Sequence, residues 1–129
     1  MALKIALKSG EKMMIGGAVV TNGSARSDLI IENRVPILRE RDIMTEEQAI
    51  SPSRRVYFAI QLMYIDGDNL VDYHNSYWKL IKAVVSAAPS TLKLIDQING
   101  YVLTSKYYQA LKLARKLIDY EQEVINSVQ

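Results

Sequence analysis

Hydrophobic and polar residues follow two different periods along the chain. Near the start, Leu3, Ile5 and Leu7 alternate with less apolar positions, which is the period-two pattern of a strand with one buried face. Later, apolar residues recur every three or four positions, which is typical of amphipathic helices. The pattern therefore predicts an α+β fold, with a small antiparallel β module in residues 1–43 followed by an α-helical bundle in residues 44–129.

Turn residues divide the β module into short extended segments. Ser9-Gly10 and Gly16-Gly17 can form tight turns, and Asn22-Gly23 is typical of a type I′ hairpin turn, which needs positive φ at both central residues. The strands expected between these turns cover residues 3–8, 12–15, 18–21 and 29–31, the last of them buried.

The last segment of the module, Val35–Ile43, separates its charges by sign if it is extended. One face then carries Arg39 and Arg41, and the opposite face carries Glu40 and Asp42. A proline near its start cannot donate to a β ladder, so this segment is expected at a sheet edge.

Helix boundaries in the second part follow from capping residues, proline and glycine. The expected signals are a capping box at Thr45 and Gln48, a start at Ser51-Pro52, an N-cap at Asp68 or Asn69, a stop at Pro89, an N-cap at Ser90, a break at Gly100 and a last start at Thr104 or Ser105.

Aromatic residues are confined to the helical part. All ten lie between Tyr57 and Tyr120, so the bundle can build the larger core. A sheet of about 43 residues buries too little surface to be stable by itself. We therefore expect the module to pack on the helices or to pair with a second copy. Disorder is expected only at the end, from about Asn126.

Composition excludes several classes of function. The chain has no cysteine, which removes disulfides, thiolate metal sites and thiol catalysis. Lysines interrupt the apolar N-terminus, and no run of about 20 apolar residues is present, so neither a signal peptide nor a membrane helix is expected. A cytoplasmic protein is the default expectation.

No motif indicates catalysis or metal binding. The Asp66-Gly67-Asp68-Asn69 run lacks the later ligands of an EF-hand, so a helix–helix turn is the better interpretation. His74, the single histidine, is expected at a surface or boundary position. The sequence therefore predicts neither an enzyme nor a site for a cofactor, a metal or a small-molecule substrate.

The net charge of +2 lies entirely in residues 1–43, which hold seven basic and five acidic residues. Solvated surface charge is the simpler interpretation. The alternative is an RNA-binding surface that works through cations and backbone groups, since no aromatic is available there for base stacking. Its foremost candidates are Arg39 and Arg41, supported at the RNA backbone by Lys4, Lys8, Lys12 and Arg34.

Several collinear segments resemble the FlbT family of flagellar biosynthesis repressors. They include LKIALKSGEKMMIGG, IENRVPILRERDI, SPSRRVYFAIQ and YYQALKLARKLIDYE, and the similarity extends over roughly residues 1–122. The resemblance implies a post-transcriptional regulator that binds the 5′ untranslated region of flagellin mRNA, represses translation and promotes mRNA decay, although some members are activators. It also implies a FlaF-type flagellar regulator as partner.

Two segments of the β module, residues 5–15 and 35–43, are similar, in the same order along the chain, to segments of the carbon storage regulator CsrA. CsrA is an interlocked β dimer that binds mRNA leaders. That similarity implies a homodimer and matches Arg39 to the RNA-contacting arginine in the last strand of CsrA. The arginine in the first strand of CsrA corresponds to Leu7 here, so that contact is absent. A rival interpretation is an adaptor that binds a FlaF-type regulator or flagellin through a helical groove and acts on RNA only indirectly.

Overall fold

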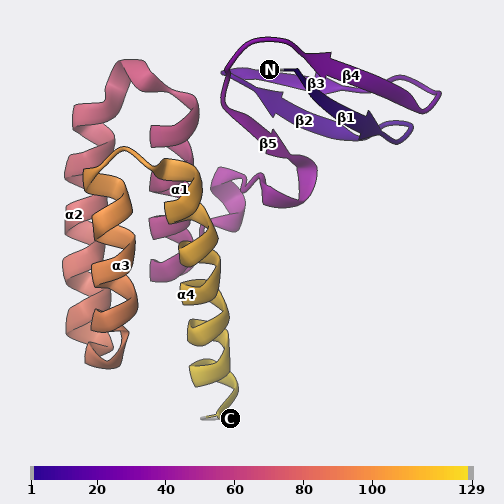
Figure 1. Ribbon diagram of the computed structural model, residues 1–129. Coiled ribbons are helices and arrows are strands. Elements are labelled where there is room, and N and C mark those ends of the chain that lie inside the picture. The colour runs from indigo at the N-terminus through magenta and orange to yellow at the C-terminus, as the bar shows by residue number, and fades with distance from the viewer. Residues whose placement is uncertain (1, 128–129) are drawn as a thin grey trace. The chain divides into compact units, whose positions relative to one another are not determined.

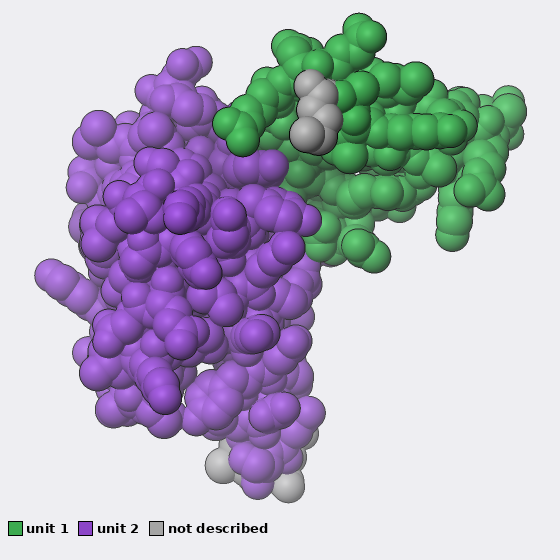
Figure 2. Space-filling view, in the orientation of Figure 1, with its two compact units in different colours: residues 1–43 green, residues 44–129 purple. Residues whose placement is uncertain are grey.

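The computed structural model describes residues 2–127 and shows five strands followed by four α-helices, which confirms the α+β prediction (Figure 1). The chain divides into two compact units, residues 1–43 and residues 44–129 (Figure 2). We refer to them as the β module and the helical unit.

Two small antiparallel sheets form the β module. Strand β1 (Leu3–Leu7) pairs with β4 (Ser27–Ile31) in one sheet. The other sheet has the order β3-β2-β5 and comprises Ala18–Thr21, Lys12–Ile15 and Ile37–Arg39. The short β5 lies at an edge, as its proline predicts, and the carbonyl of Pro36 accepts a hydrogen bond from Gly16 N at 2.8 Å just before the strand.

The two sheets share one apolar core. Ile5 and Leu7 of β1 and Met13 of β2 are buried. The period-two pattern of β1 accounts for this, because alternate side chains point to the same face. Half-buried side chains from both sheets pack around these three, namely Ile15, Leu29, Ile31 and Ile37.

Two expectations for the module are wrong. Gly23 does not have a positive φ, and β3 and β4 pair with other strands, so Asn22-Gly23 is no type I′ hairpin. Strand β4 is only half-buried, with Ile30 61% exposed, because the outer face of the two-stranded sheet is open. Strand β3 instead pairs with β2, which directly precedes it, whereas β4 pairs with β1, which is distant in the sequence and could not be found from short-range signals.

The segment Val35–Ile43 is extended over a shorter stretch than predicted. A 3₁₀ turn over Glu40–Asp42 follows β5 directly. Arg41 therefore does not share the strand face of Arg39, and the expected separation of charges by sign along one strand is not formed.

Four helices make up the helical unit: α1 (Pro52–Ile65), α2 (Leu70–Ala87), α3 (Leu92–Leu103) and α4 (Tyr107–Ser127). Helix α1 packs against both α2 and α4, and α3 packs against α4. The fully buried side chains include Ile60, Met63, Tyr77, Ile98 and Leu117. Residues 128–129, within the end for which disorder was expected, lie outside the described residues, whereas Asn126 is helical.

The N-terminal boundaries of the unit agree with the capping signals. Thr45 and Gln48 form the capping box, around a 3₁₀ turn at Glu46–Gln48. Before α1, the Ser51 hydroxyl accepts a hydrogen bond from Arg54 N at 3.2 Å. Side chains that accept bonds from otherwise unpaired backbone N–H groups explain why both helical segments begin there.

The start of α2 agrees with the prediction, because Asn69 is its N-cap residue, although its side chain makes no capping hydrogen bond. Asp66 caps the preceding 3₁₀ turn at Gly67–Asn69, where its carboxylate accepts from Asp68 N at 3.1 Å. The start of α3 differs from the prediction. Ser90 caps nothing in the 3₁₀ turn at Pro89–Thr91, and its hydroxyl contacts the Tyr120 hydroxyl instead.

Helix α3 also differs, because it continues through Gly100 to Leu103. Buried Ile95, Ile98 and Val102 fix one face of α3. This packing outweighs the low helix propensity of one glycine.

Candidate nucleic-acid interface

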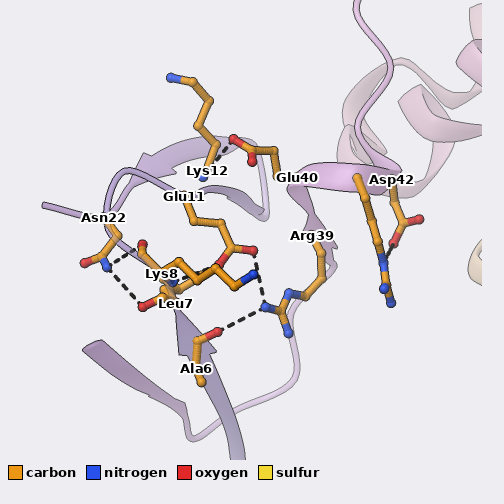
Figure 3. Close-up of polar contacts among 10 residues, drawn as sticks. Ala6, Leu7, Lys8, Glu11, Lys12, Asn22, Arg39, Glu40 and Asp42 are labelled. Atoms are coloured by element: carbon orange, nitrogen blue, oxygen red, sulfur yellow. Dashed lines mark hydrogen bonds and ion pairs between the residues drawn. The ribbon is translucent and has the colours of Figure 1, made fainter. Parts of the chain in front are cut away.

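Arg39 is held by intramolecular contacts at one end of the β module (Figure 3). Its Nη2 donates to the Ala6 carbonyl at 3.0 Å and lies 3.3 Å from the Glu11 carboxylate. In the β2–β5 register Arg39 is opposite Met13, so it lies on the face that builds the module's core. The guanidinium therefore joins β5 to β1, while 40% of the side chain remains exposed.

Glu11 organises the turn next to Arg39. Its carboxylate accepts a hydrogen bond from Lys8 N at 2.9 Å. This backbone hydrogen bond is the largest cause that lowers the pKa of Glu11 from its ordinary value, and Arg39 lowers it further. Glu11 was not among the predicted site residues, and no local signal singles it out, since its partner Arg39 lies 28 residues away.

Lys8 and Lys12 are exposed at the same end of the module. The Lys12 side chain projects from the outer face of β3-β2-β5, where its Nζ donates to Thr21 Oγ1 at 3.3 Å. Its backbone N donates to Glu40 Oε1 at 3.2 Å. Lys8 and Arg39 thus lie beside Glu11, whereas the Lys12 side chain points away from it (Figure 3).

The other candidate cations are dispersed. Lys4 is on the outer face of β1–β4, 70% exposed, with Nζ 3.5 Å from Asp28. Since Lys12 is on the outer face of the other sheet, these two lysines point to opposite sides of the module. Arg41 is 86% exposed in the 3₁₀ turn, with Nε 3.9 Å from Asp42.

Arg34 belongs to the β4–β5 connection, near the opposite end of β1–β4 from Lys8. It is exposed and has no hydrogen-bond or ion-pair partner among residues 2–127. Of the six predicted cations, the structure therefore brings Lys8 and Arg39 together beside Glu11 and leaves the other four separate.

Acidic residues partly neutralise the positive charge at the Lys8 end of the β module. Glu11, Glu40 and Asp42 lie among Lys8, Lys12, Arg39 and Arg41, so this end of the module is only weakly basic. Such a surface can contact a few phosphates, each through a separate cation, but it does not form a continuous basic track.

Histidine and acidic side chains were the remaining candidates for metal binding. Within residues 2–127, histidine and acidic side chains nowhere gather in a group able to hold a metal ion. His74 is half-buried, as expected, and its Nε2 lies 3.0 Å from the Tyr107 hydroxyl. Over the same residues, no helix combines the length and apolar character needed to cross a membrane.

Comparison with known proteins gives a consistent assignment. The family described as flagellar protein FlbT matches residues 3–125. The probable flagellum biosynthesis repressor protein FlbT 1 of Bradyrhizobium diazoefficiens is 46% identical over 125 residues, covering 96% of this chain and 85% of the relative.

Two further relatives extend this comparison. The flagellum biosynthesis repressor protein FlbT of Caulobacter vibrioides is 37% identical over 130 residues, covering 99% and 92% of the two chains. The corresponding probable repressor of Agrobacterium fabrum is 30% identical, covering 97% and 85%. No solved structure matches the chain. A family match over nearly the whole length, together with these identities, establishes that the chain belongs to the FlbT family of flagellar proteins.

Proposed function

We propose that the protein represses flagellum biosynthesis after transcription, by binding the 5′ untranslated region of flagellin mRNA. Bound protein would block translation and promote decay of the message through recruited machinery. The observation that carries the proposal is family membership over residues 3–125, because relatives are named as flagellum biosynthesis repressors.

The β module is the proposed contact surface. Lys8, Lys12 and Arg41 are exposed near one end, and each can reach a phosphate without displacing a buried group. Arg39 would act there through its exposed edge while it holds β5 in place. Lys4 and Arg34 would contact RNA that extends beyond this end.

Salt dependence tests the proposed surface. Each phosphate contact to a single strand contributes about 0.7 to the slope of log affinity against log salt. We expect Lys12→Ala with Arg41→Ala to lower the slope for a flagellin leader transcript by about 1.4. Fluorescence anisotropy across a salt series measures both affinity and slope.

The matched control is Lys82→Ala with Lys93→Ala, two exposed lysines of the helical unit. Equal slopes for the two double variants would contradict the assignment to the β module. Absence of binding by the unmodified protein at low salt would contradict direct RNA recognition.

A cleft in the helical unit favours the second candidate, an adaptor that binds a FlaF-type regulator or flagellin. The cleft measures about 570 Å³ and lies between α1 and α2, with Phe58, Leu62 and Leu80 in its walls. Ile50 and Val71, each 75% exposed, directly adjoin the lining residues Ala49 and Asp72 in the sequence. Exposed apolar residues and an apolar cleft are typical of protein-binding sites.

Ser76→Arg tests the adaptor, because Ser76 is exposed and lines the cleft. We expect it to abolish binding of purified FlaF-type regulator in calorimetry, because the added side chain fills the cleft. Ser86→Arg places the same charge on α2 outside the cleft-lining residues and should leave binding intact. Equal binding by both variants would remove the cleft as the partner site.

Self-association through the β module is a further part of the proposal. Val19 and Ile30 are about 60% exposed on the outer strands of the two sheets, and a second copy could cover them. Sedimentation equilibrium should then give twice the 14.6 kDa chain mass. A monomer at all concentrations would contradict it.

A further inference from the structure

The β module contains a cleft at the end remote from Lys8. Its volume is about 420 Å³, which lies within the range of about 300–1,000 Å³ typical of small-ligand sites. The apolar walls come from both sheets, since Leu3 and Ile31 belong to β1–β4 and Ile37 belongs to β5. Leu3 is 52% exposed, so the cleft opens to solvent at the end of the sheets.

Polar side chains of the β4–β5 connection complete the lining. Glu32, Asn33 and Arg34 are all exposed. None of the three has a hydrogen-bond or ion-pair partner for its side chain among the described residues. A carboxylate, an amide and a guanidinium therefore stand free beside an apolar cleft.

This combination matches the chemistry of a nucleotide. A base has two apolar faces that aliphatic walls can cover, and its edges exchange hydrogen bonds with amides and carboxylates. A guanidinium can either pair with the phosphate or stack on the base. The module has no aromatic residue, so aliphatic side chains would have to supply the apolar contact that other RNA-binding modules obtain from Phe or Tyr.

We propose that this cleft receives one unpaired nucleotide of the bound RNA, with the base against Leu3 and Ile37 and the phosphate at Arg34. The proposal rests on the RNA-binding function proposed above. It places the base-contacting site at the opposite end of β1–β4 from Lys8. It assigns to Arg34 the binding of the phosphate of the nucleotide held in the cleft.

Two matched pairs of variants separate base contact from charge. Leu3→Ala removes part of the apolar wall, and we expect about threefold weaker RNA binding with an unchanged salt slope. Leu92→Ala trims a leucine of comparable exposure at the start of α3 and should change neither quantity. Arg34→Ala should lower the salt slope by about 0.7 if it pairs with the phosphate, whereas Arg26→Ala, an exposed arginine outside the cleft, should not.

Methyl NMR locates the base directly. Protein labelled at Ile, Leu and Val methyl groups is titrated with a single-stranded flagellin leader fragment and with the same strand made abasic. We expect the Leu3 and Ile37 methyl resonances to shift with the normal strand and not with the abasic strand. The resonances of two buried side chains, Leu7 in the β module and Ile98 in the helical unit, serve as references within each unit.

The outcomes distinguish this inference from the function on which it rests. If RNA binds while the Leu3 and Ile37 resonances stay fixed, the cleft assignment is wrong and RNA binding stands. If no RNA binds at low salt, both fail. Equal shifts with the abasic strand, or shifts with a leucine-rich peptide but not with RNA, would overturn the assignment of the cleft to a base.

Discussion

At the scale of single residues, side chains that suggest binding also hold the chain together. Arg39 donates to the Ala6 carbonyl and pairs with Glu11. The Asn22 amide donates to the carbonyls of Leu7, Lys8 and Ala25, at distances of 2.8–3.2 Å. An arginine or an asparagine in the sequence can either contact RNA or stabilise a turn. Only the spatial neighbours of Arg39 and Asn22 show that both stabilise the fold.

Arg39→Ala should destabilise the β module by about 1 kcal/mol, because a partly buried hydrogen bond to Ala6 is lost. Hydrogen exchange of the β5 amides measures the change, since the module contains no aromatic reporter. Arg41→Ala is the control and should stay within about 0.5 kcal/mol of the unmodified protein, because Arg41 is 86% exposed. Equal exchange in the two variants would contradict the structural role of Arg39.

Stability of the module should also fall in acid. The pKa of Glu11 is lowered from 4.5, chiefly by the hydrogen bond from Lys8 N. Its stabilising contribution is therefore present above pH 4.5 and is lost as the pH falls through the folded-state pKa. In the Glu11→Gln variant, amide hydrogens of the β module should exchange faster than in the unmodified protein at neutral pH, and at the same rate well below pH 4.5. A difference in exchange rate that stays the same at both pH values would argue against this linkage.

Gln61 makes a buried contact that the sequence does not reveal. Its side chain accepts from Met44 N at 2.8 Å and donates to Met44 O at 2.9 Å, and both residues are buried. Gln61→Leu leaves both backbone groups unpaired, so we expect a loss of about 2 kcal/mol in the free energy of unfolding. Urea denaturation followed by Trp78 fluorescence measures it, and a loss below about 0.5 kcal/mol would contradict this account.

At the scale of elements, capping and period predict most helices and strands, and packing decides the exceptions. Strand β5 is shorter than its alternating pattern suggests, and α3 is longer than its glycine suggests. For α3, the buried contacts of Ile95, Ile98 and Val102 outweigh the low helix propensity of one glycine.

Two glycines should respond to alanine in opposite directions. Gly100 is helical, and an added Cβ would meet no atom within 4 Å, so Gly100→Ala should stabilise the helical unit by about 0.5–1 kcal/mol. Gly16 has φ +59° in the β2–β3 turn, where an L side chain is strained, so Gly16→Ala should destabilise the module. Thermal denaturation gives both signs, and destabilisation by Gly100→Ala would show that α3 is strained there.

At the scale of the whole molecule, the two units differ in the chemistry they contain. Every tyrosine lies in the helical unit, and Tyr77 is fully buried with its hydroxyl bonded to Asn99 Oδ1 at 2.5 Å. Burial raises the pKa of Tyr77 above its ordinary value of 10.0. Ionisation of the buried Tyr77 hydroxyl therefore destabilises the folded helical unit.

Alkaline pH should unfold the helical unit. The contribution of neutral Tyr77 is complete below pH 10.0 and is lost as the pH rises through the folded-state pKa. Tyrosinate absorbance compared between the unmodified protein and Tyr77→Phe isolates the ionisation of Tyr77, and we expect that ionisation to coincide with loss of helix. Ionisation of Tyr77 with the helices intact would refute the expectation.

The sequence by itself determined the α+β class, the helix starts at Thr45, Ser51 and Asn69, and the family. These features depend on residues close together in the chain or on similarity along its whole length. Tertiary structure decided which strands pair, where each cation points and where the clefts lie. The physical reason is that contacts such as that of Arg39 with Ala6, 33 residues apart in the sequence, depend on how the two sheets pack. The hydrophobic period of a single strand carries no information about which distant residue it will contact.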